Sequence, residues 1–264
     1  MTTSTVLQAA IDTSARTGRA KVVVVIQQKG GTGKTTIAIN VAAVSGRSAV
    51  LSNADESVGA PVVAAGIDIQ GSIEKWCARV EDKRQREALP FDYLVTKSKV
   101  GILPAVVNDP ERHRVIVDTP GFFDVDPDAE WDADPIGTGR SADALREVLE
   151  VADLAIVPIT PSRMSWDEAE YTIERVLKPR GIRFLVVINM HDPSKDKSET
   201  QLDKLKAWID ERNYPRVSHP IRRYTIHENA HENGTLVTEY KMSGTALNAR
   251  EDFMRVALTM EQML

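Results

Sequence analysis

The chain has 264 residues, of which 42% are hydrophobic and 27% are charged, and its formal net charge is −5. This length and composition fit one large α/β domain, and the net charge excludes a global field that attracts nucleic acid or anionic lipid. One cysteine, no secretory signal pattern and no apolar run near the roughly 18 residues of a membrane span indicate a cytoplasmic protein without a membrane partner.

Apolar runs and helical periodicities alternate along the chain. Residues 1–20 are polar and are expected to form a short N-terminal extension, followed by one domain over residues 21–264. Strands separated by helices predict a doubly wound, mostly parallel α/β sheet with helices on both faces, whose ligands bind beyond the carboxyl ends of the strands. The expected strands are residues 22–26, 49–52, 114–117, 154–159 and 183–188. The expected helices are residues 34–44, 72–89, 141–151, 166–177, 199–212 and 244–264.

A glycine-rich loop stands between the first expected strand and the first expected helix. Its glycines let consecutive backbone N–H groups turn toward one anion, and the helix N-terminus adds partial positive charge. Lys34 can reach the β- and γ-phosphates, and the Thr35 hydroxyl can bind Mg²⁺. The sequence therefore predicts a P-loop that binds ATP and Mg²⁺. The expected nucleotide-binding residues in it are Lys29, Gly30, Gly31, Thr32, Gly33, Lys34, Thr35 and Thr36.

A second acidic signal lies at the end of the expected strand 114–117. The strand is apolar and ends in Asp118, which is the Walker-B arrangement of a carboxylate that holds Mg²⁺ through water. An aspartate at a strand end is often only a turn former. The P-loop favours the metal role, with Thr35 and Asp118 as the metal-binding residues.

The P-loop departs from the general pattern G-x-x-x-x-G-K-S/T, because Gln28 replaces the first glycine and Lys29 follows it. In this respect it resembles the ParA/MinD family, whose deviant loop reads K-G-G-x-G-K-S/T. The resemblance implies an ATPase in which Lys29 crosses the interface of an ATP-bound homodimer and contacts the nucleotide of the other subunit. A solvated lysine beside a phosphate site is the alternative.

Two further residues receive roles from this resemblance. The family often has D-x-D-P-Q after its second strand, and its second aspartate positions the attacking water; by position this is Asp55, although Asn53 replaces the first aspartate. In related proteins an asparagine at about the position of Asn189 contacts the adenine, so the resemblance gives this role to Asn189. Each residue could instead cap a loop or close a turn.

Residues 221–240 resemble the ParA-type partition ATPases, which carry an I-x-R stretch and a V-x-E-Y-like ending at this spacing. The resemblance implies a nucleoid-associated ATPase whose ATP dimer binds DNA non-specifically, and whose hydrolysis is stimulated by a centromere-bound, ParB-like adaptor protein. Arg222 and Arg223, beside Tyr224, offer charge and a stacking plane to a phosphate backbone. A solvated pair or a structural salt bridge is the alternative.

Other functions compete with partition. A MinD-like membrane-positioning ATPase would end in a basic amphipathic helix, but the C-terminal helix carries one arginine against three acids and an apolar face better explained by core packing. A metabolic P-loop ligase or synthetase would need a dedicated substrate pocket. The pattern H-E-x-x-H at His227 and His231 matches the zinc-protease signature, but Asn233 and Gly234 stop any helix there.

Overall fold

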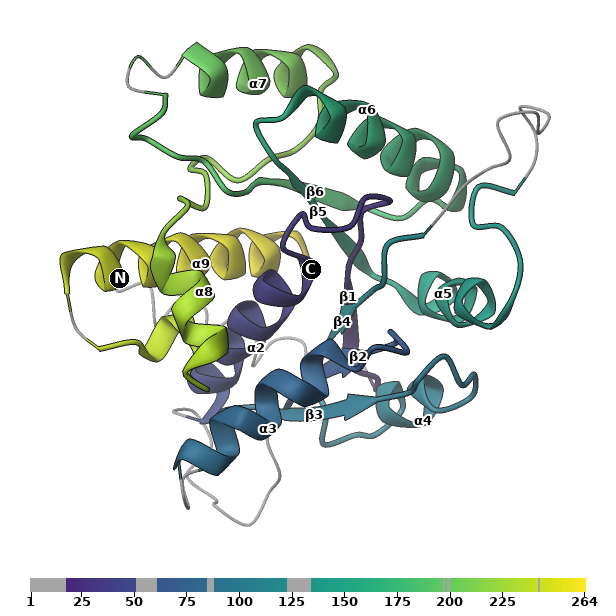
Figure 1. The fold of residues 1–264 in the computed structure, drawn as a ribbon. Coiled ribbons are helices and arrows are strands. Elements are labelled where there is room, and N and C mark those ends of the chain that lie inside the picture. The colour runs from purple at the N-terminus through teal and green to yellow at the C-terminus, as the bar shows by residue number, and fades with distance from the viewer. Residues whose placement is uncertain are drawn as a thin grey trace.

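The computed structural model describes residues 18–50, 61–84, 88–122, 134–196, 198, 200–241 and 243–264. Six strands form one sheet in the order β3-β2-β4-β1-β5-β6, and every neighbouring pair is parallel (Figure 1). The predicted doubly wound parallel sheet is therefore confirmed. The strands are β1 (Lys21–Val25), β2 (Val62–Gly66), β3 (Asp92–Val95), β4 (Arg114–Asp118), β5 (Leu154–Ile159) and β6 (Phe184–Ile188).

Helices cover both faces of the sheet, because alternate strand residues point to opposite sides. In β1, Val23 and Val25 belong to one core and Val22 and Val24 to the other, and all four are fully buried. The first core is covered by α2 (Lys34–Val50), α3 (Ser72–Arg84), α8 (Thr225–Glu232) and α9 (Gly244–Met263). The second core is covered by α4 (Leu103–Val107), α5 (Arg140–Val151), α6 (Arg163–Tyr171), the π-helix η1 (Thr172–Leu177) and α7 (Thr200–Glu211). Two short 3₁₀ turns, η2 (Lys178–Arg180) and η3 (Val237–Glu239), complete the described elements.

The second strand is not where the sequence predicted it. The prediction placed a strand at residues 49–52, but α2 continues to Val50, and residues 51–60 lie outside the described part of the chain. Gly46, a residue type common at helix ends, lies inside α2 because the backbone of Pro90 packs against it and leaves no room for a Cβ. The strand paired with β4 is β2, twelve residues beyond α2.

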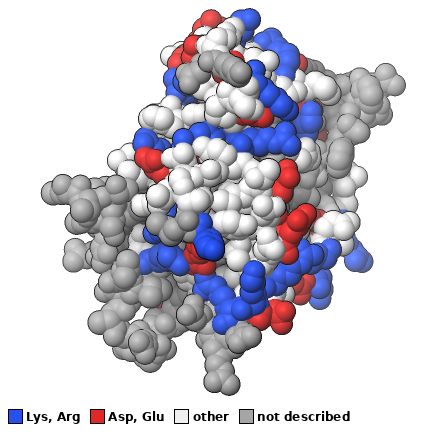
Figure 2. All heavy atoms as spheres, turned by 60° about the vertical axis from the view of Figure 1, so that its left-hand side comes forward, with Lys and Arg blue, Asp and Glu red and all other residues white. Residues whose placement is uncertain are grey.

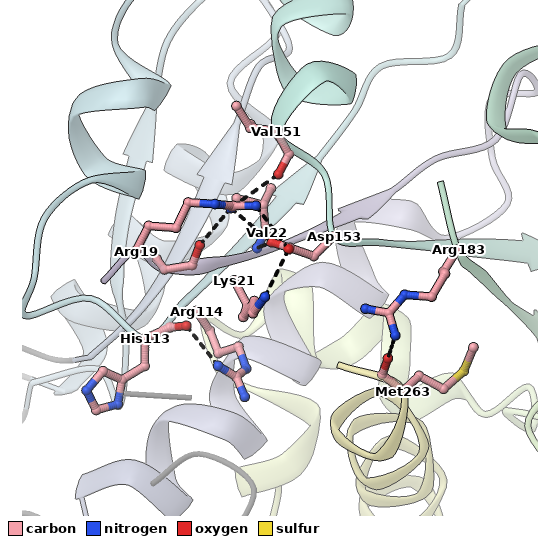
Figure 3. A network of polar contacts seen from close by, with 10 residues as sticks. Arg19, Lys21, Val22, His113, Arg114, Val151, Asp153, Arg183 and Met263 are labelled. Atoms are coloured by element: carbon pink, nitrogen blue, oxygen red, sulfur yellow. Dashed lines mark hydrogen bonds and ion pairs between the residues drawn. The ribbon is translucent and has the colours of Figure 1, made fainter. Parts of the chain in front are cut away.

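Ion pairs hold the end of the sheet opposite the P-loop, where the strands begin (Figure 3). Asp153, just before β5, accepts hydrogen bonds from the Arg19 and Lys21 side chains and from the Val22 N–H, at 2.8 to 3.2 Å. Arg114, at the start of β4, forms a fully buried ion pair with Glu261 near the end of α9. These contacts fasten residues 19–22 and the end of α9 to the sheet.

The C-terminal helix α9 packs against the sheet core beside α2 (Figure 1). Its residues Phe253, Val256, Ala257 and Met260 are each 0% exposed, as the core-packing interpretation of its apolar face predicted. No helix among the described residues is long and apolar enough to cross a bilayer.

Candidate active site

The carboxyl ends of three neighbouring strands meet at one point of the sheet. Asp118, the last residue of β4, is in register with Val25 of β1 on one side and with Gly66 of β2 on the other. The P-loop follows β1, and α2 begins with Lys34. The structure therefore brings the P-loop and Asp118 together, as the positions of both at strand ends predicted.

The P-loop backbone is shaped by its glycines. Gly31 and Gly33 have φ values of 75° and 85°, in the left-handed region that favours glycine. At Gly33 a Cβ would also collide with the amide nitrogen of Asn189, at the end of β6. On the other side Gly121 packs closely against the loop, where a Cβ would lie 3.0 Å from Gln28 O. The loop is thus clamped between segments that follow β4 and β6.

Lys34 lies under the loop and is 7% exposed. Its Nζ donates hydrogen bonds to Gln27 O at 3.0 Å and to Lys29 O at 2.8 Å. Burial lowers the pKa of Lys34 from 10.5 to about 8, while the carboxylates of Asp118 and Asp68 oppose this shift. The structure therefore holds the Lys34 ammonium against the backbone at the start of the P-loop.

Thr35 and Asp118 are in direct contact. The Thr35 hydroxyl donates a 2.7 Å hydrogen bond to Asp118 Oδ2, whereas Asp118 Oδ1 is buried and has no hydrogen-bond partner among the described residues. Burial raises the pKa of Asp118 from 3.8 to about 7, opposed by the Thr35 hydrogen bond and by Lys34. A buried carboxylate with a free oxygen beside a hydroxyl has the donor set that Mg²⁺ prefers.

Asp68 is a site residue that the sequence reasoning missed. It follows β2 by two residues, and its charge acts on both Lys34 and Asp118. Its carboxylate accepts a 3.0 Å hydrogen bond from Gln70 N–H. The stretch from Gly66 to Gln70 has the spacing of D-x-D-P-Q, with Asp68 at the second aspartate and a glutamine at the last position. That spacing after a run of apolar residues could have identified it, whereas Asp55 lies outside the described residues.

Lys29 lies beside α6, and its Nζ is 3.6 Å from Glu168 Oε2. One turn later, Thr172 opens the π-helix η1, and its hydroxyl accepts a 3.2 Å hydrogen bond from Gln28 N–H. The hydroxyl also lies 2.8 Å from Glu168 O. The first residues of the P-loop are therefore attached to α6, a contact that the sequence did not predict.

Asn189 contacts the loop itself. Its Nδ2 donates a 2.7 Å hydrogen bond to Thr32 O, and its Oδ1 accepts one of 2.9 Å from Met190 N–H. It lines a cavity of about 550 Å³ that runs from the P-loop between α3 and α8. Contact with adenine stays a prediction. The cavity is also lined by Gly33, Thr35, Thr36, Ser72, Trp76, Met190, Arg223, Tyr224, His227, Glu228, His231 and Glu232.

The two predicted DNA-binding arginines lie in different surroundings. Arg222 forms a two-pronged ion pair with Asp252 on α9, with Nη2–Oδ1 at 2.7 Å and Nε–Oδ2 at 3.0 Å. Arg223 is 55% exposed, and its nearest carboxylate, Glu228, is 3.7 Å away. Their DNA contact stays a prediction, but the ion pair of Arg222 favours the structural alternative for that residue.

The H-E-x-x-H pattern does fall on a helix, α8, which ends at Glu232. His227 packs against Phe253 with ring centroids 5.7 Å apart, and His231 meets the edge of Trp76 at 5.2 Å. Burial lowers the pKa of both imidazoles. The described residues contain no cluster of three His, Cys, Asp or Glu side chains that could hold a metal, so the described part of the chain offers no zinc-protease centre.

Comparison with known proteins was made by sequence and by structure. No protein-family model matches the chain. It is 28% identical over 237 residues to maintenance of carboxysome distribution protein A of Gloeobacter kilaueensis, covering 90% of this chain and 92% of that protein.

Solved structures show the same fold. The cell-division protein MinD of Aquifex aeolicus has a TM-score of 0.62 and 15% identity, covering 91% of this chain and 96% of that one. A putative plasmid partition protein of Borrelia burgdorferi, bound to AMPPNP, has a TM-score of 0.59 and 13% identity, covering 91% and 99%. The deviant P-loop and the similarity to the Gloeobacter relative agree with this fold, which the chain shares with MinD and with the plasmid partition protein.

Proposed function

We propose that the chain hydrolyses ATP with Mg²⁺, binds DNA without sequence preference as an ATP-bound homodimer, and positions a cargo through an adaptor protein. One observation carries the catalytic part of this proposal. Lys34, Thr35 and Asp118 converge below the P-loop, and the buried Asp118 Oδ1 has no hydrogen-bond partner among the described residues. A structural turn would not keep a carboxylate oxygen buried and unpaired.

The residues present fit Mg-ATP. The left-handed glycines free the loop N–H groups for phosphate oxygens, Lys34 would neutralise charge on the β- and γ-phosphates, and Thr35 with Asp118 would hold the metal. Bound Mg-ATP supplies the phosphoanhydride whose cleavage drives the cycle. Asp68, whose charge acts on both Lys34 and Asp118, would orient the attacking water, the role that the resemblance gives to Asp55. Lys29 would leave Glu168 and reach the partner's nucleotide.

Two cargo classes are candidates. The resemblance of residues 221–240 to partition ATPases favours a DNA cargo and a centromere-bound, ParB-like adaptor. The Gloeobacter relative, whose name refers to carboxysome distribution, favours a protein assembly as the cargo. Both readings share the ATP-dependent dimer and a nucleoid scaffold. Membrane attachment through α9 is disfavoured because its apolar face is buried.

The test is DNA binding by the full chain with ATP, with ADP and without nucleotide, on duplexes of unrelated sequence. We expect binding only with ATP, of similar affinity for each duplex. Lys34→Ala should abolish nucleotide binding, whereas Lys29→Ala should bind nucleotide as a monomer and fail to dimerise with a slowly hydrolysed analogue. Lys178→Ala is the matched control for Lys29→Ala, because it also removes a lysine paired with a helix glutamate, and it should dimerise normally. DNA binding that ignores the nucleotide would refute the proposal.

A further inference from the structure

The helix α3 carries a row of three cations. Lys75, Arg79 and Lys83 are spaced four residues apart and are all exposed, so they follow one side of the helix over about 12 Å. None of the three has a carboxylate within 4.0 Å among the described residues. Most other arginines on the described surface, including Arg222, are paired with an acid. Other exposed cations without a described carboxylate partner lie singly on separate elements, whereas these three follow one side of a single helix.

The row is also held in place by neutral contacts from the α8 side. Lys83 Nζ donates a 2.9 Å hydrogen bond to Asn233 O, and Arg79 Nη1 lies 3.2 Å from His231 Nε2. Two of the three acids of α3 are engaged elsewhere: Glu74 pairs with Lys97, and Glu81 accepts a hydrogen bond from Tyr93. The third, Asp82, is exposed and lies on the same helix without an ion pair to the row. Figure 2 shows Lys and Arg side chains gathered over the lower half of the α8 side of the molecule, with Asp and Glu among them.

We propose that the Lys75–Arg79–Lys83 row is a contact surface for the phosphate backbone of DNA. The inference rests on the proposed DNA binding and assigns its location. Cations about 6 Å apart along a helix suit a ligand with regularly repeated negative charge. Protein partners usually need buried aromatic or aliphatic anchors, and none of the exposed large hydrophobic residues of the described chain lies on α3. Contacts limited to phosphates give binding without sequence preference.

The position of α3 links this surface to the nucleotide. Ser72 and Trp76, on the inner side of the same helix, line the cavity that begins at the P-loop. The helix starts four residues after Asp68, whose backbone oxygen accepts a hydrogen bond from Gly71 N–H. A nucleotide that fills the cavity therefore contacts the helix whose outer side carries the row. Dimerisation would present two such rows.

The test measures DNA affinity of the full chain, with a slowly hydrolysed ATP analogue, against salt concentration. The triple variant Lys75→Gln/Arg79→Gln/Lys83→Gln should lower the steepness (the absolute slope) of log affinity against log salt by about 2.7 for each engaged protomer, at about 0.9 for each lost phosphate contact. The double variant Lys75→Gln/Lys83→Gln leaves the Arg79–His231 contact intact and should lower it by about 1.8.

The matched control removes three equally exposed cations that also lack a described carboxylate partner but lie on separate elements. This variant, Lys99→Gln/Arg140→Gln/Lys204→Gln, changes the net charge by as much as the triple variant of the row does, and it should leave the slope unchanged. An unchanged slope in the triple variant, or an equal loss in the control, would overturn the inference. Equal competition by poly-L-glutamate and by duplex DNA would assign the row to acidic protein segments and overturn it as well. Failure of the unaltered protein to bind DNA would instead refute the proposed DNA binding.

Discussion

The buried carboxylate of Asp118 should cost the ligand-free protein stability at neutral pH. Burial raises its pKa from 3.8 to about 7, so the folded state keeps a proton that the unfolded state has lost. Below pH 3.8 both states are protonated and the cost is absent. It grows as pH rises and is complete above pH 7, where the folded protein must hold a dry, ionised carboxylate. Asp118→Asn should therefore stabilise the ligand-free protein while removing a metal ligand.

The size of the effect follows from the shift. Each pH unit between the two pKa values corresponds to about 1.4 kcal/mol, so the stability gained by Asp118→Asn should grow by about 3 kcal/mol between pH 5 and pH 8. The amide keeps an acceptor for the Thr35 hydroxyl, so the 2.7 Å hydrogen bond need not be lost. Comparing variant and parent at each pH cancels the titration of every other group to first order.

The assay is urea unfolding with a metal chelator at pH 5, 6, 7 and 8. Asp210→Asn is the control, and its effect on the free energy of unfolding should have the opposite sign. Arg216 lowers the pKa of that exposed carboxylate, so removing the charge of Asp210 should be mildly destabilising above pH 4. A stability difference between Asp118→Asn and the parent that stays constant with pH would show that Asp118 is ionised without penalty. The reasoning about its burial would then be wrong.

Three further outcomes are expected. Glu168→Gln should raise the fraction of dimer severalfold at a limiting concentration of ATP analogue, because Lys29 loses the carboxylate 3.6 Å away. Size exclusion measures this fraction, and an unchanged value would show that the ion pair does not restrain Lys29. Asp68→Asn should lower ATP turnover by about a hundredfold while analogue affinity stays within twofold, and normal turnover would move the water-positioning role elsewhere. Glu261→Gln should lower the free energy of unfolding by about 3 kcal/mol, since it leaves Arg114 buried without its counter-charge, whereas Glu251→Gln on the surface of the same helix should cost little.

Strong local signals made four neighbouring strands of the sheet, β4-β1-β5-β6, predictable. The valine run of β1, the β4 run ending in Asp118, and the patterns of β5 and β6 give correct strands within one residue. Each is a fully buried parallel strand, so its composition is dictated by burial on both faces. The P-loop sequence fixed the connection between β1 and α2.

The remaining two strands, β2 and β3, depend on contacts distant in sequence. Gly46 suggests a helix end, but its role is to let Pro90 approach α2. A helix that ends early leaves residues 49–52 free to be predicted as the second strand, whereas α2 continues to Val50. The water-positioning role of Asp55, which lies outside the described residues, stays a prediction. The β2 run contains two alanines and a glycine, a weak strand signal that becomes a strand through pairing with β3 and β4.

The unusual start of the P-loop is explained by its attachment to α6. Gln28 and Lys29 replace the usual glycine-led opening, and the structure holds both of them through Thr172 and Glu168. Lys34 meanwhile donates to carbonyl oxygens of the loop rather than to a phosphate. Under the proposed function, ATP competes with these two hydrogen bonds for Lys34, and the partner subunit's nucleotide competes with Glu168 for Lys29. The proposal thus has different events release the two lysines, and we expect nucleotide binding and dimer closure to be separable steps.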